Sequence, residues 1–94
     1  DTRESPALDF IKILKKSGHI VNFYDPIVKK ISSRKLKDEM KSIKLNLKNL
    51  KNQDLVYILT NHSNINYRLI ENHAKKIIDT RNVFKKKSIK INTL

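Results

Sequence analysis

Apolar positions near the start of the chain repeat with the period of a helix. Ser5 and Pro6 suit the N-cap and the first position of a helix. The apolar positions that follow at helical spacing are Ala7, Leu8, Phe10, Ile11, Ile13 and Leu14. Because this stripe is wide enough to face a core, we predict a helix over about 6–17. Gly18, the one glycine of the chain, follows as its stop residue.

The segment 19–24 is short, β-branched and aromatic, and it predicts a strand. Asp25 and Pro26 end this strand and turn the chain, because proline cannot donate to a strand ladder. A helix that leads to a strand across one glycine is typical of the second half of a β-α-β unit. We therefore expect the first strand of that unit to lie just before Asp1, outside this sequence.

The pattern is weakest in the middle of the chain. Ser33 suits the cap of a short helix that carries Leu36 and Met40. Ile43 and Leu45 alternate with a lysine, which indicates a brief strand. These two short elements are the expectations for this region.

A short helix and the clearest strand pattern of the chain come next. The segment 46–52 predicts one or two helical turns with Leu47 and Leu50 facing inward. The segment 55–60 is apolar at successive positions, as is typical of a central strand of a parallel sheet that is covered on both faces.

The last third of the chain repeats this order. A polar loop over 61–64 leads to a helix over about 65–74, and 76–79 predicts a short buried strand. A lysine-rich tail follows, in which Ile89 and Ile91 either pair as an edge strand or stay mobile.

This alternation of helices and strands predicts an α/β fold. We expect a three-layer, Rossmann-like parallel sheet with helices on both faces, whose first strand is missing from the chain. The length of 94 residues fits one small domain, which we assign to 1–83, with a basic tail over 84–94.

Composition narrows the possible functions. The chain has no cysteine, which excludes disulfides, thiolate metal sites and a thiol nucleophile. Its 21 Lys and Arg against 9 Asp and Glu give a formal charge of +12, which favours anionic partners. The lysines are spread along the chain with few aromatic neighbours, so solvated lysine is the simpler interpretation of the charge. A nucleic-acid-binding module stays an alternative. No apolar run approaches the length of a membrane span.

Four strings of residues resemble one family. They are 1–8 at the start of the first helix, 24–26 at the end of the next strand, 60–62 after the central strand, and 78–83 after the last strand. In this order and spacing they resemble the C-terminal UDP-binding domain of the UDP-glucose/GDP-mannose dehydrogenase family, and in detail its members that oxidise UDP-N-acetylhexosamines. Asn61 departs from the family pattern, which has aspartate at this position.

The resemblance implies a part of an enzyme. The intact enzyme would oxidise the C6 alcohol of a UDP-sugar, a UDP-N-acetylhexosamine or UDP-glucose, to a carboxylate with NAD. The catalytic cysteine and lysine and the glycine-rich NAD loop would lie in preceding domains, so we expect neither catalysis nor a cofactor in this chain alone. The implied partners are a UDP-sugar, the preceding domains and further copies of the enzyme. The expected location is the cytoplasm, and the expected process is polysaccharide biosynthesis. A purely structural or oligomerisation domain is the other alternative.

Three residues are candidates for binding. The resemblance assigns Arg81 to the UDP-sugar site, where a guanidinium can hold phosphate oxygens in a bidentate manner; the structural alternative is a salt bridge to Asp79 or to a neighbouring residue. Arg3 either approaches the ligand or fixes a loop between domains. His62 either contacts the ligand or another domain, or organises its own loop. The histidines lack the spacing of metal ligands, so we expect no metal.

Overall fold

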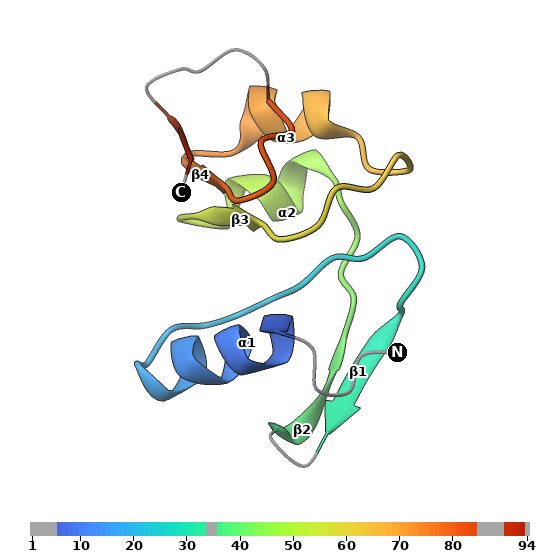
Figure 1. Cartoon of the computed structure of the whole chain (residues 1–94), viewed down its shortest axis with the longest axis vertical. Helices are drawn as coiled ribbons and strands as arrows, with labels where there is room; N and C mark the ends of the chain where they lie inside the picture. The colour runs from blue at the N-terminus through green and yellow to red at the C-terminus, as the bar shows by residue number, and fades with distance from the viewer. Residues whose placement is uncertain (1–5, 34–35, 85–89, 94) are drawn as a thin grey trace. The chain divides into compact units, whose positions relative to one another are not determined.

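Figure 1 shows a computed structural model of the chain, which describes residues 6–33, 36–84 and 90–93. The chain divides into two compact units, Asp1–Ile43 and Lys44–Leu94, and each is described by itself. Among the described residues, no helix is long and apolar enough to cross a lipid bilayer.

The first unit begins with the helix α1 (Pro6–Lys16), which confirms the predicted helix. Leu8 and Ile11, three residues apart, are buried on one face of this helix. The N–H of Gly18 donates to a carbonyl of the last turn, and Gly18 has a φ of 90°, which a residue with a Cβ rarely adopts. The single glycine is therefore required by the way the helix ends.

Two antiparallel strands, β1 (Lys30–Ser33) and β2 (Leu36–Lys41), form a hairpin in the first unit. Ile31 pairs with Met40, and both are buried in one core with Leu8 and Ile11. The predicted helix capped by Ser33 is therefore wrong. Residues four apart, such as those chosen to mark that helix, also share one face of a strand, so their spacing fits both structures.

The segment 19–24 forms no regular strand, which corrects the prediction. A backbone bond connects the N–H of Ile43 to the carbonyl of Phe23 at 2.9 Å. Val21 and Phe23 pack against the first core, whereas Ile20 is 93% exposed. The alternation of a strand is therefore present, but a strand also needs a continuous ladder with a neighbour.

The predicted turn at Asp25 and Pro26 is confirmed. The Oδ1 atom of Asp25 accepts the N–H groups of Ile27 and Val28, each at 2.8 Å. The hydroxyl of Ser42 accepts the N–H of Asp25 at 3.0 Å. The side chain thus replaces strand hydrogen bonds with local ones.

The second unit contains a parallel sheet with helices. Its elements are α2 (Leu47–Lys51), β3 (Val56–Ile58), α3 (Tyr67–His73), β4 (Ile77–Asp79) and β5 (Ile91–Thr93). The strand order is β3-β4-β5, and both neighbouring pairs are parallel. The predicted α/β class with a parallel, Rossmann-like sheet is confirmed.

Asparagine side chains begin both helices of this unit. The Oδ1 atom of Asn46 accepts the N–H of Asn49 at 2.8 Å, and that of Asn66 accepts the N–H of Leu69 at 3.1 Å. Each bond satisfies a backbone donor that has no partner inside its helix.

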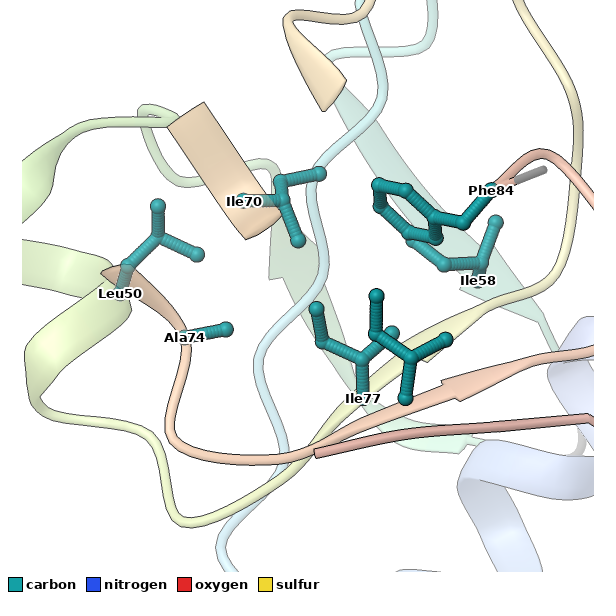
Figure 2. Packing of buried hydrophobic residues seen from close by; sticks show 7 residues of the cluster. Leu50, Ile58, Ile70, Ala74, Ile77 and Phe84 are labelled. Carbon is teal, nitrogen blue, oxygen red and sulfur yellow. The ribbon is translucent and has the colours of Figure 1, made fainter. Parts of the chain in front are cut away.

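The core of the second unit lies between these helices and the sheet (Figure 2). Its buried members are Leu50, Ile58, Ile70, Ala74, Ile77, Phe84 and Ile91. Leu50 faces inward as predicted, but Leu47 is 41% exposed, because the five residues of α2 present only one side to the core. The predicted strand at Ile43 and Leu45 is absent; Leu45 instead packs against this core.

β4 is the central strand among the described ones, and β3, which lies within the predicted strand 55–60, is at one edge of that described sheet. β3 has β4 as its one neighbour in the described sheet, whereas β4 pairs on both sides. Of the two alternatives for the tail, β5 favours pairing as a strand, because Ile91 pairs with Ile77 and is buried. Ile89 lies outside the described residues.

Candidate functional site

The loops that bear two of the candidate residues leave the same edge of the sheet. In the parallel pair of β3 and β4, Val56 lies opposite Ile77 and Ile58 lies opposite Asp79, so both strands end together. We call this edge, with the loops 59–66 and 80–84 that follow the two strands, the carboxyl edge. Ligands of parallel α/β sheets bind at such edges.

Asp79 organises the loop that follows β4. Its side chain is 1% exposed, its Oδ1 atom accepts the N–H of Arg81 at 3.1 Å, and its Oδ2 atom accepts the N–H of Phe84 at 3.0 Å. Asn82 adopts a φ of 55°, a left-handed conformation that asparagine tolerates better than most residues. The buried carboxylate therefore folds the chain around Arg81 into a tight turn.

The side chain of Arg81 is hydrogen-bonded to the backbone directly after the neighbouring strand β3. Its Nε atom donates to the carbonyl oxygen of Leu59 at 2.9 Å, and the side chain is exposed. The N–H of Thr80, one residue earlier, donates to the carbonyl of Ile58 at 3.2 Å. The structural alternative was a salt bridge from Arg81 to Asp79 or to a neighbouring residue. Among the described residues Arg81 forms no ion pair, and Asp79 accepts its backbone N–H instead. In the described part of the chain, no residue partners the two terminal amino groups of Arg81.

The hydroxyl of Tyr67 organises the other loop of the carboxyl edge. It accepts the N–H of His62 at 2.8 Å and lies 3.3 Å from the carbonyl oxygen of Thr60, to which it can donate. The ring of Tyr67 meets the ring of Phe84 edge to face, with centroids 6.1 Å apart. Tyr67 thus contacts both loops of the carboxyl edge.

The imidazole of His62 takes part in its own loop through one nitrogen. Its Nδ1 atom accepts the N–H of Asn64 at 3.2 Å, and its carbonyl accepts the N–H of Ile65 at 3.1 Å. An acceptor at Nδ1 places the proton of the neutral ring on Nε2. Among the described residues, nothing bonds to that Nε2.

The structure therefore places the loops of Arg81 and His62 at one edge, and Arg3 lies outside the described residues. Sequence reasoning missed the supporting roles of Tyr67 and Asp79. For Asp79 a signal was present, since it is an acidic residue directly after two isoleucines of a predicted buried strand. Within the described ranges, no cluster of three or more acidic or histidine side chains is arranged to hold a metal ion.

Comparisons with known proteins identify the family. A family model described as the UDP binding domain of the UDP-glucose/GDP-mannose dehydrogenase family matches residues 1–86. Comparisons with curated proteins and with solved structures gave no match. The matched region includes both loops of the carboxyl edge. The chain therefore belongs to the UDP-glucose/GDP-mannose dehydrogenase family, and it corresponds to the UDP-binding domain of that family.

Proposed function

We propose that the carboxyl edge binds the diphosphate of a UDP-sugar and that Arg81 is its main ligand-binding residue. The intact enzyme would be an NAD-dependent UDP-sugar 6-dehydrogenase that acts on a UDP-N-acetylhexosamine or on UDP-glucose. Arg3 is a second proposed binding residue, on the resemblance alone. We further propose, on the same ground, that the domain works with preceding domains in a cytoplasmic homo-oligomer.

The attachment of Arg81 to Leu59 is the observation that carries this proposal. A guanidinium whose Nε atom is engaged still presents its two terminal amino groups as a planar fork, which matches two phosphate oxygens. The bond to a backbone carbonyl restrains a side chain that is otherwise flexible, so less conformational entropy is lost when an anion binds. Arg81 is therefore prepared for a phosphate group at the place where such sheets bind ligands.

The residues present do not fit the pyrophosphate of NAD. A dinucleotide-binding turn needs glycines where the backbone approaches the phosphates. Gly18 is the only glycine, it ends α1, and a Cβ built on it would meet no atom within 4 Å. That position is thus no close-packed cradle, and we derive no redox step from this chain. Its proposed contribution is binding energy from the unreactive end of the substrate, which helps to align the reacting carbon.

An NMR titration of the 94-residue chain with UDP tests the proposal. We expect weak, saturable binding that Arg81→Ala weakens about 10- to 100-fold, as for the loss of a hydrogen bond to a charged group. Arg81→Lys should restore part of the affinity, because it keeps the charge but loses the fork. Arg68→Ala is the matched control, because Arg68 is exposed on α3 and the net charge changes equally. Binding that survives Arg81→Ala unchanged would contradict the assignment.

A further inference from the structure

The carboxyl edge holds a second polar group that the proposed function does not yet use. The neutral imidazole of His62 carries its proton on Nε2, because Nδ1 accepts the N–H of Asn64 at 3.2 Å. In the part of the chain that the structure describes, this Nε2 has no partner. His62 is half-buried, and among the described residues no unpaired side-chain nitrogen or oxygen is fully enclosed, so this Nε2 keeps some exposure to solvent.

A chain of contacts connects the backbone of His62 to Arg81. The backbone N–H of His62 donates to the hydroxyl of Tyr67, which also lies 3.3 Å from the carbonyl of Thr60. The residue before Thr60 in the sequence is Leu59, whose carbonyl accepts the Nε of Arg81. The two candidate residues are therefore fixed to the same short stretch of backbone at the end of β3.

A second route closes this connection into a ring. The ring of Tyr67 packs edge to face against Phe84, and the N–H of Phe84 donates to Asp79. The same carboxylate of Asp79 accepts the N–H of Arg81. The two loops of the carboxyl edge are thus joined to each other through Tyr67, Phe84 and Asp79.

We propose that the Nε2–H of His62 is a second hydrogen-bond donor to the diphosphate that Arg81 binds, and that Tyr67 is the positioning residue for it. This inference rests on the proposed function. A diphosphate offers acceptor oxygens on two phosphorus atoms, and in this proposal the residue on each loop binds a different phosphate.

Two substitutions separate this role from a purely local one. His62→Asn keeps an acceptor for the N–H of Asn64, because an asparagine oxygen commonly binds the N–H two residues ahead, but it removes the Nε2 donor. His62→Gln places an amide N–H near the position of Nε2 but gives up the Nδ1 acceptor. A ligand role predicts that Asn is the worse replacement, whereas a role in the loop alone predicts that Gln is worse.

The measurement is UDP affinity by NMR titration of the full 94-residue chain, with the ¹⁵N shifts of the His62 ring followed in the wild type. We expect His62→Asn to weaken UDP binding about tenfold or more, the size expected for a bond to a charged acceptor. His62→Gln should stay within about threefold of the wild type, and UDP should shift the Nε2 resonance. Equal UDP affinities for the wild type and both variants, or weaker UDP binding by the Gln variant than by the Asn variant, would overturn the proposal.

Two further ligands, pyrophosphate and uridine, show which part of UDP His62 contacts. A comparison of the variants then separates this inference from the proposed function. Inorganic pyrophosphate should lose affinity in the Asn variant as UDP does, and weak binding of uridine should not change; the opposite pattern would overturn the assignment to the diphosphate. If Arg81→Ala weakens UDP binding and His62→Asn does not, the role of His62 fails and the proposed function stands. If the wild type does not bind UDP, both fail.

Discussion

The carboxylate of Asp79 reaches five residues ahead along the chain to accept the N–H of Phe84 at 3.0 Å. Both residues are buried, and Phe84 belongs to the core of the second unit (Figure 2). One hydrogen bond therefore joins the end of β4 to the core and encloses the turn that carries Arg81. Because the bond is shielded from water, its loss would leave an unsatisfied backbone donor.

Replacing Asp79 with asparagine should weaken this turn. Asp79 uses one oxygen for the N–H of Arg81 and the other for the N–H of Phe84, so an amide must set its NH₂ group against one of the two donors. We expect Asp79→Asn to cost about 1–3 kcal/mol in the second unit. Amide hydrogen exchange at Phe84 measures this loss directly.

Asp25 supplies the matched control for that substitution. Its two backbone donors, Ile27 and Val28, both bind the same oxygen, Oδ1, which an asparagine retains. Asp25→Asn should therefore change hydrogen exchange at Val28 much less than Asp79→Asn changes it at Phe84. Similar effects at both sites would show that loss of charge matters more than the arrangement of acceptors.

Removing the hydroxyl of Tyr67 should loosen the loop after β3 and leave the core packed. Tyr67→Phe deletes the acceptor of the His62 N–H but keeps the edge-to-face contact with Phe84. We expect faster hydrogen exchange at His62, equivalent to about 1–2 kcal/mol, with less change at Ile77. Tyr24→Phe removes a hydroxyl with no partner among the described residues and should leave both sites unchanged.

Ile77 should be the most costly aliphatic side chain to shorten in the second unit. It is 0% exposed and lies in β4 between two neighbouring strands, so Ile77→Ala leaves a cavity and should cost about 2–5 kcal/mol. Ile20→Ala, the same change at a residue that is 93% exposed, should cost under about 0.5 kcal/mol. Global hydrogen exchange or urea unfolding of the two variants distinguishes these outcomes.

Elements that depend on a few consecutive residues could be predicted from the sequence. The stripe and stop residue of α1, the strand β4 and the helix α3 were found because periodicity and caps act within one or two turns. The turn at Asp25 was found for the same reason, since its hydrogen bonds span only two and three residues.

Elements that depend on a distant partner could not be predicted. The β1–β2 hairpin was mistaken for a helix because the spacing of Leu36 and Met40 fits both, and only the pairing of Ile31 with Met40 decides between them. The segment 19–24 has the alternation of a strand without the ladder of one. The central position of β4 likewise depends on β5, which joins it from the tail of the chain.

By itself, the sequence determined that an arginine follows a buried strand of an α/β fold, because apolar runs and the strings that resemble the family are properties of neighbouring residues. Only the tertiary structure decided that Arg81 is attached to Leu59, 22 residues away, and that Tyr67 and Asp79 support its surroundings. The physical reason is that every residue has a backbone carbonyl, so the sequence does not show which of them a side chain will contact. Which carbonyl a side chain meets is fixed when strands pair in register.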